Sequence, residues 1–451
     1  MKSESANIIV TPLKSAVLEG HRNKLNVLVR MQAPDLPETS SNTRPSYGVA
    51  FVIDRSGSMA GKPLDEAVRC VNFMVDRLLE SDAAALVTFD SHVALDYPLT
   101  SLTDKREIQT ILATVHSGGT TNLHGGWRAG ADEFVYKESK AAIKRVILLS
   151  DGRANEGLTN PNQIADQAEE FASKGITTST YGLGREFNEE LMVDLAKAGQ
   201  GNHYYAETAE DLLESFNEEF ELMANLWAKD LILSIQPKDG VQIKLMNDYR
   251  RIDGELYSWR MPSIAFSSEA WAMFEVTIAA ELSDGQFAEL FAASLIGVDI
   301  DEQSIKLEAP LLKLPVINSQ AYSAIAEDEL VKRRLDEVMA AEYLQKARRA
   351  VQHGDWDAAD GLLQEAKVLF RTSPWAKDVL ESMEKLAKKR DDAYFMKEAM
   401  FSTARMSSRL SSKSEHASVL SEANSISFLR RKTAQGKSQF LKDDDIDVIK
   451  N

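Results

Sequence analysis

Short, continuous apolar runs alternate with amphipathic segments between residues 49 and 198, and this alternation constrains the fold more than any other feature of the chain. The apolar runs cover residues 49–53, 84–89, 146–149 and 176–181. Each is typical of a strand that is covered on both faces. The segments between them have the 3.6-residue spacing of helices and cover residues 64–78, 104–115, 122–137, 161–173 and 187–198. The alternation predicts a doubly wound, parallel α/β sheet, which a helix over residues 208–227 closes.

The sequence on either side of this region has a period of two. Leu25, Val27, Val29 and Met31 alternate with polar residues, and a similar alternation returns between residues 231 and 315. We expect residues 1–46 and 228–320 to form one antiparallel β-sandwich. The α/β domain, residues 47–227, would be inserted into it, because insertion is tolerated where the ends of a domain lie close together.

Helical spacing predicts a C-terminal helical region over residues 321–400. A helix, a turn at Gly354-Asp355 and a second helix look like one tetratricopeptide-style hairpin, with Trp356 in its core. We find no second copy in the sequence, so a peptide-binding array of such hairpins is not supported.

The last segment, residues 401–451, differs in composition and is predicted to be a partly disordered tail. Residues 401–440 hold 11 Ser and 2 Thr, and 7 basic against 2 acidic residues, a net charge of +5. The first serines to examine for phosphorylation are Ser407, Ser408, Ser411 and Ser412. The alternative is a helix docked through Met406, Leu410, Val419, Leu420 and Phe428.

Charge and cysteine content narrow the class of protein. The chain has 69 acidic and 52 basic residues, a net charge of −17, which argues against nucleic-acid binding. Its one cysteine, Cys70, lies on the apolar face of the helix predicted over residues 64–78, so we expect a buried thiol and no disulfide scaffold. We see neither a signal peptide nor an apolar run long enough to span a membrane, and expect a cytoplasmic protein.

Oxygen-bearing side chains follow the predicted strands at the points where they end. Asp54-Arg55-Ser56-Gly57-Ser58 follows the first strand, Ser150-Asp151-Gly152 follows the third, and a Gly-rich loop, residues 118–123, carries Thr120 and Thr121 between them. Because parallel strands end at one edge of their sheet, these side chains should lie close together. Carboxylates and hydroxyls suit a hard cation such as Mg²⁺. The structural alternative is that Ser56 and Ser58 cap the helix that starts near Lys62.

With these motifs in place, residues 47–227 resemble the von Willebrand factor type A domain and its metal-ion-dependent adhesion site. The resemblance also takes in residues 182–184 and 202–205. It implies binding of Mg²⁺ or Mn²⁺, and Thr121 is preferred to Thr120 because family members have a Gly five residues later, here Gly126. The implied metal ligands are Asp54, Ser56, Ser58, Thr121 and Asp151.

The order of the flanking regions resembles the heavy chains of the inter-alpha-trypsin inhibitor and their prokaryotic relatives. Those heavy chains are cleaved after a motif that ends in Asp-Pro-His, and this chain has no Asp-Pro dipeptide. Their covalent attachment to glycosaminoglycan is therefore not carried over to this chain.

The sequence predicts a binding protein and not an enzyme. It has no nucleophile-elbow motif for a Ser-His-Asp triad and no phosphate-binding loop, and His124 and His203 are expected to be structural. The predicted function is metal-dependent interaction with a protein partner that offers an Asp or Glu carboxylate. The alternative is a non-catalytic subunit of an AAA-type ATPase or chelatase, and a kinase and phosphatase as partners would indicate a signalling scaffold.

Overall fold

The computed structural model describes residues 6–36, 44–151, 154–183, 189–206, 209–279, 281–408, 410–412, 429 and 431. These residues form two compact units. The first, here called the α/β unit, comprises the described residues from 44 to 226. The second, here called the sandwich unit, comprises the described residues up to 36 and those from Trp227 to Arg431.

A twisted sheet forms the centre of the α/β unit. Its strands, in order across the sheet, are β6 (Val93–Ser101), β5 (Ala83–Phe89), β4 (Tyr47–Asp54), β7 (Ile143–Ser150), β8 (Ile176–Leu183) and β9 (Gln200–Ala206). Each of the four predicted strands is present, and β5, β4, β7 and β8 run parallel. The predicted α/β fold class is therefore confirmed.

Two strands of this sheet were not predicted. β9 adds a parallel strand beside β8, whereas β6 pairs antiparallel with β5, so the sheet is not entirely parallel. The reason is the short connection between β5 and β6, over residues 90–92, which can only return the chain antiparallel. The signal was in the sequence, because Val93, Leu95, Tyr97 and Leu99 alternate with polar or smaller residues.

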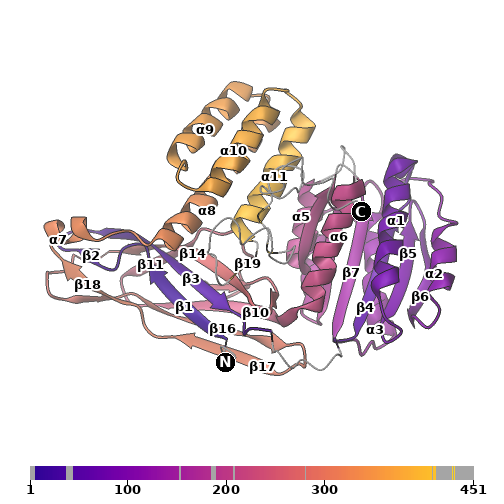
Figure 1. Cartoon of the computed structure of the whole chain (residues 1–451), viewed down its shortest axis with the longest axis horizontal. Helices are drawn as coiled ribbons and strands as arrows, with labels where there is room; N and C mark the ends of the chain where they lie inside the picture. The colour runs from indigo at the N-terminus through magenta and orange to yellow at the C-terminus, as the bar shows by residue number, and fades with distance from the viewer. Residues whose placement is uncertain are drawn as a thin grey trace, which may run out of the picture. The chain divides into compact units, whose positions relative to one another are not determined.

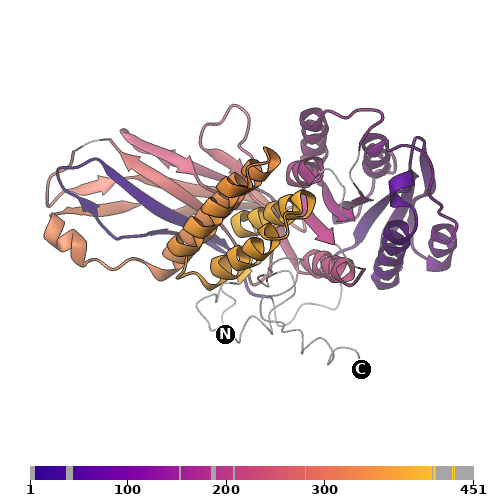
Figure 2. The same ribbon diagram turned by 90° about the horizontal axis from the view of Figure 1, so that it is seen from above.

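Helices cover both faces of the sheet in the α/β unit (Figure 2). α3 packs on the face that carries Ala50 and Val52, where a Cβ on Gly130 would lie 2.5 Å from Val52 Cγ2. On the opposite face Tyr47 contacts Phe220 of α6, with ring centroids 5.9 Å apart. The helices are α1 (Lys62–Arg77), α2 (Lys105–Leu112), α3 (Leu123–Tyr136), α4 (Pro161–Ala172), α5 (Glu189–Ala198) and α6 (Ala209–Ala224).

The sandwich unit is built from two antiparallel sheets and a smaller mixed sheet. One sheet has the order β1 (Asn7–Pro12), β3 (Asn23–Gln32), β14 (Ser268–Ile278), β11 (Val241–Leu245). The second has the order β12 (Ser258–Arg260), β10 (Leu226–Pro237), β16 (Phe291–Asp299), β17 (Ser304–Ala309), with β13 (Ile264–Ala265) beside β10. The smaller sheet holds β15 (Phe287–Glu289), β18 (Lys313–Ile317) and β2 (Val17–Leu18), and β18 pairs parallel with β2.

Strand β14 is the centre of the sandwich unit and is covered on both faces. Phe274 on its inner face contacts Trp259 and Phe291 of the second sheet, at ring-centroid distances of 5.3 and 6.4 Å. Trp271 and Met273 on its outer face pack with apolar residues of α8, which lies above this sheet (Figure 1). β14 pairs along its length with β3, from the other end of the chain.

The C-terminal helices confirm the predicted helical region and form a bundle. They are α7 (Ser319–Ala324), α8 (Glu329–Gln352), α9 (Trp356–Leu369), α10 (Pro374–Ala387) and α11 (Asp392–Ser408). α10 and α11 make a second helix pair, and α11 packs against α8, so the bundle closes on itself. Trp356 is half-buried and donates its indole N–H to Asp392, which differs from its predicted place in the core.

The end of α11 differs from the predicted boundary of the tail at residue 401. The helix continues to Ser408, because Phe401 and Met406 are buried in the bundle. Beyond it, β19 (Ser411–Ser412) pairs with β14, and Leu429 and Arg431 are buried. Val419, Leu420 and Phe428, proposed as docking residues, lie outside the described residues. In the part of the chain that the structure describes, no helix is long and apolar enough to cross a membrane.

Candidate metal centre

Asp54 is the last residue of β4, between β5 and β7, and its side chain is fully buried. Its Oδ1 accepts a hydrogen bond from the backbone N–H of Ser56 at 2.8 Å, and its Oδ2 accepts one from the Ser150 hydroxyl at 2.5 Å. Burial raises the pKa of Asp54 to about 6, although these hydrogen bonds lower it, and the carboxylate of Asp151 adds to the increase. The contacts described for this carboxylate are with an N–H and a hydroxyl, not with Lys or Arg.

Ser56 directly precedes a short turn of 3₁₀-helix, Gly57–Met59, and Ser58 lies within it. The Ser56 and Ser58 hydroxyl oxygens are 3.2 Å apart. Neither side chain caps α1, whose N-cap is Gly61, and the Ser56 side chain makes no cap bond to the short turn either. The helix-capping explanation of these serines is therefore wrong.

The Gly-rich loop is fastened beside this turn by backbone hydrogen bonds. Gly57 N–H donates to Gly119 O at 3.1 Å, and Gly118 N–H donates to Arg55 O at 2.7 Å. Of the two threonines that follow, Thr121 is only 2% exposed. Its N–H donates to Asn155 Oδ1 at 2.8 Å.

Thr120 differs from its neighbour because its side chain is exposed and already engaged. Its hydroxyl contacts Ser91 Oγ at 2.8 Å and donates to the Glu156 carboxylate. This difference favours Thr121 over Thr120 as the candidate ligand, because the Thr120 hydroxyl is already engaged.

Asp151 follows β7 directly and is 7% exposed. Because β7 pairs in parallel with β4 and the Ser150 hydroxyl reaches Asp54, the loop that carries Asp151 starts beside the end of β4. Gly152, which the sequence analysis also placed on this loop, lies outside the described residues, as does the next residue, Arg153.

Asp90 is a residue of this sheet edge that the sequence analysis missed. It follows β5 directly, is 6% exposed, and its Oδ2 lies 3.0 Å from Arg55 Nη2. A Cβ on Gly118 would lie 2.8 Å from the same oxygen, so the Gly-rich loop needs glycine there. The rule that selected Asp54 and Asp151, a polar residue at the end of a strand, also selects Asp90.

The two histidines named from the sequence are hydrogen-bonded. His124 Nε2 lies 3.0 Å from Gln167 Oε1. His203 Nδ1 lies 2.9 Å from the Thr180 hydroxyl, which itself donates to Met192 O. Burial lowers the pKa of His203 to about 3, so its ring is neutral at pH 7.

The donor set of this sheet edge fits a hard divalent cation. Asp54 and Asp151 are carboxylates, and the serine and threonine side chains add neutral oxygens. A buried carboxylate is stable when a positive charge pairs with it, and Asp54 shows no such partner among its described contacts. Within the described ranges, no group of three or more His, Cys, Asp or Glu side chains could hold a metal, so a transition-metal site of that kind is not present there.

Comparisons with known proteins match the α/β unit to one domain family. Residues 48–219 match the family model of the von Willebrand factor type A domain. "Uncharacterized protein YfbK" of Escherichia coli is 31% identical over 203 residues, which are 44% of this chain and 35% of YfbK. Human inter-alpha-trypsin inhibitor heavy chain H3 is 28% identical over 184 residues, 38% of this chain and 20% of the heavy chain. The chain therefore spans only a minor part of the length of these relatives.

A solved structure extends the likeness beyond this domain. The structure titled "von Willebrand factor type A from Catenulispora acidiphila" covers 88% of this chain, and 96% of its own chain is matched, with a TM-score of 0.68. The two sequences are 16% identical, so this match shows the fold alone. From the sheet, the loops at its edge and these matches, we conclude that residues 48–219 form a von Willebrand factor type A domain.

Proposed function

We propose that the α/β unit binds Mg²⁺ or Mn²⁺ and uses the bound ion to hold a carboxylate of a protein partner, without catalysis. The observation that carries the proposal is the fully buried Asp54 carboxylate, whose described contacts include no cationic side chain. The residues that would hold the ion are Asp54, Ser56, Ser58, Thr121 and Asp151.

The two kinds of ligand have different roles in this proposal. Asp54 and Asp151 supply two negative charges, which offset the charge of a divalent ion. The hydroxyls of Ser56, Ser58 and Thr121 supply neutral oxygens, directly or through water. When bound, the ion supplies a concentrated positive charge at the sheet edge, where a carboxylate of the partner replaces water.

In this proposal the bound ion supplies the main attraction for an acidic partner. The net charge of −17 opposes the approach of an acidic protein. Of the cationic residues that the sequence places near the motifs, Arg55 is paired with Asp90, so its charge is largely offset. Lys62, the first residue of α1, is exposed.

Calorimetric titration of Mn²⁺ into the full chain tests the metal site. Asp54→Asn keeps the shape of the side chain and removes its charge, so we expect Mn²⁺ affinity to fall at least a hundredfold. The matched control is Asp132→Asn on α3, whose carboxylate pairs with Arg128 at 3.0 Å and should not contribute. Equal Mn²⁺ affinity in the Asp54 and Asp132 variants would rule out the assignment.

Carboxylate binding can be tested before any partner is known. Water bound to Mn²⁺ accelerates the relaxation of solvent protons, so a ligand that displaces this water lowers the relaxation rate of the Mn²⁺-loaded chain. Acetate at tens of millimolar should lower it, and acetamide, which has nearly the same shape and no charge, should not. The same effect from both compounds would contradict carboxylate binding. A partner captured with Mg²⁺ should then be released by a chelator.

A further inference from the structure

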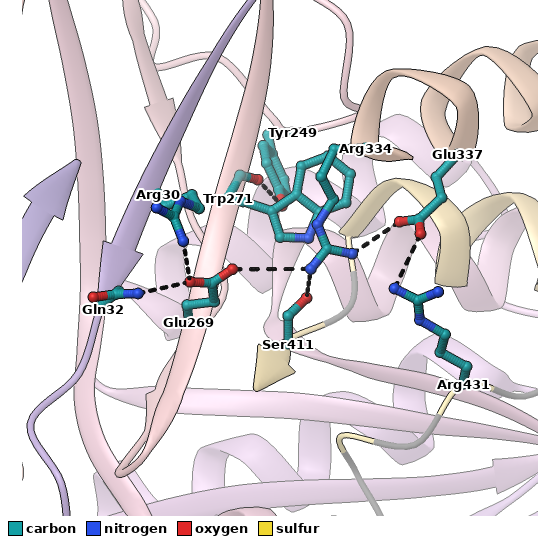
Figure 3. A network of polar contacts seen from close by, with 9 residues as sticks. All are labelled: Arg30, Gln32, Tyr249, Glu269, Trp271, Arg334, Glu337, Ser411 and Arg431. Carbon is teal, nitrogen blue, oxygen red and sulfur yellow. Dashed lines mark hydrogen bonds and ion pairs between the residues drawn. The ribbon is translucent and has the colours of Figure 1, made fainter. Parts of the chain in front are cut away.

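Arg334 of α8 is a fully buried cation at the centre of a polar network in the sandwich unit (Figure 3). Its guanidinium lies over the Trp271 ring, 4.8 Å from the centroid. It donates to Glu337 Oε2 at 2.9 Å and lies 3.9 Å from Glu269 Oε1. Glu337 and Glu269 are themselves buried, so these charges depend on one another for their stability.

Two further members of the network come from the C-terminal segment of the chain. Arg334 Nη2 donates to the Ser411 hydroxyl at 2.6 Å. Arg431 Nη2 lies 3.3 Å from Glu337 Oε1, and its guanidinium lies over the Trp375 ring, 5.6 Å from the centroid. Figure 3 shows Ser411 and Arg431 approaching α8 from separate places in the chain.

The backbone of the same segment extends a sheet. β11 pairs with β14 only over residues 274–278, which leaves the first half of this edge of β14 without a strand. Tyr249 Oη donates to Trp271 O at 2.9 Å, and Met273 N–H donates to Asn247 Oδ1 at 2.6 Å, so side chains occupy the middle of the edge. β19 occupies its start, where Ser411 pairs antiparallel with Glu269.

We propose that Arg334, Glu337 and the open end of β14 form a docking site that the chain's own C-terminal segment fills in cis, through Ser411–Ser412 at the sheet edge and Arg431 at Glu337. The site has the two elements of recognition by strand addition: backbone pairing along a sheet edge and side-chain contacts at set positions. A hydroxyl residue meets Arg334, and an arginine meets Glu337. This proposal does not rest on metal binding by the α/β unit.

The charges explain why the site prefers an arginine. Glu269 and Glu337 are two buried carboxylates, and the fully buried Arg334 pairs with both. Glu269 has a second partner, Arg30, at 3.4 Å, whereas Glu337 has Arg431. Arg431 brings a second cation, which is 5% exposed, to the oxygen of Glu337 that Arg334 does not use. Without it, the described cationic partner of Glu337 would be Arg334, which also pairs with Glu269.

Hydrogen–deuterium exchange of the full chain tests whether Arg431 holds the segment in place. In Arg431→Ala we expect the amides of residues 268–273 and 410–412 to exchange about tenfold faster, since a buried charged contact is lost. Arg431→Lys should recover part of the protection. Arg390→Ala is the matched control, because Arg390 also pairs with a carboxylate, that of Asp360, and also lies over a tryptophan ring, that of Trp356, but at an exposed position.

A synthetic peptide of residues 404–434, added to the Arg431→Ala chain, tests docking itself. We expect it to restore slow exchange at residues 268–273, and the same peptide with Ala at position 431 to do so at least tenfold less effectively. Unchanged exchange in Arg431→Ala would overturn the proposal. If the peptide does not restore protection, or if both peptides restore it equally, the segment is a fixed part of the fold and the docking site is ruled out.

Discussion

At the residue scale, adjacent threonines in one loop have different surroundings. Thr121 is buried, whereas the exposed Thr120 has its hydroxyl held by Ser91 and Glu156. We predict that Thr121→Val, which removes a hydroxyl and keeps the shape, weakens Mn²⁺ binding about tenfold or more, by roughly 1.4 kcal/mol. Thr120→Val should change the Mn²⁺ affinity by less than twofold. Calorimetry on both variants decides the matter, and the reverse order of effects would assign the ligand to Thr120.

His203 makes the stability of the α/β unit depend on pH. Its pKa is about 3 in the folded chain, mainly because of burial and also because of Lys197, against 6.5 for an exposed histidine. Below pH 6.5 the unfolded chain binds a proton that the folded chain does not, so stability falls as the pH falls through this range. From pH 7 to pH 5 this histidine should cost about 2 kcal/mol of the free energy of unfolding.

The variant His203→Gln isolates this contribution. Between pH 7 and pH 5, the free energy of unfolding of this variant should fall by about 2 kcal/mol less than that of the natural chain. Urea unfolding at the two pH values measures the difference. His124→Gln is the control, since His124 also bonds to a side chain. If the two variants respond to pH in the same way, burial of His203 is not the cause.

At the scale of elements, the position of α3 depends on glycine. A Cβ on Gly126 would lie 2.3 Å from Phe89 Cδ1 and 2.9 Å from Phe89 Cβ, so Gly126→Ala must push the helix away from β5. We predict a loss of about 1–3 kcal/mol in the free energy of unfolding and weaker Mn²⁺ binding, because Thr121 lies just before this helix.

The control for this prediction is Gly361→Ala in α9, where a Cβ would meet no atom within 4 Å. Alanine favours helix, so this variant should be as stable as the natural chain or slightly more stable. Denaturant unfolding of the two variants measures the difference. Equal stabilities would show that α3 can move at little cost.

Elements whose pattern is local could be predicted from the sequence, and those that depend on distant partners could not. The continuous apolar run of β4 predicts a strand covered on both faces, and the end of that strand predicts Asp54. Arg334 and Glu337, three residues apart on α8, instead read as an ordinary exposed pair. Their burial depends on Trp271 and Ser411, which are distant in the sequence.

At the scale of the whole molecule, the single thiol reports on one of the two units. Cys70 is fully buried in α1, and burial raises its pKa to about 12, so a thiol reagent reacts only after the α/β unit opens. We predict that Mg²⁺ slows the labelling of Cys70. The expected factor is one plus the ratio of the Mg²⁺ concentration to Kd, where Kd is the dissociation constant of Mg²⁺ from the α/β unit.

The control for this experiment is the Asp54→Asn chain, in which labelling should not depend on Mg²⁺. Amide exchange in the sandwich unit should also stay the same with and without Mg²⁺ in the natural chain. Slower labelling in both chains would indicate a general effect of salt and not a bound ion.

The pairing of β3 with β14 joins two strands that the ribosome synthesises at very different times. Val27 lies opposite Phe274, which is 274 − 27 = 247 positions later in the chain. At about 5–20 residues per second, β3 is synthesised roughly 12 to 50 seconds before its partner. All strands of the inserted sheet lie between Tyr47 and Ala206, so that sheet can be completed during the wait. The insertion therefore sets the order of folding: the first strands to be synthesised are among the last to pair with their partners.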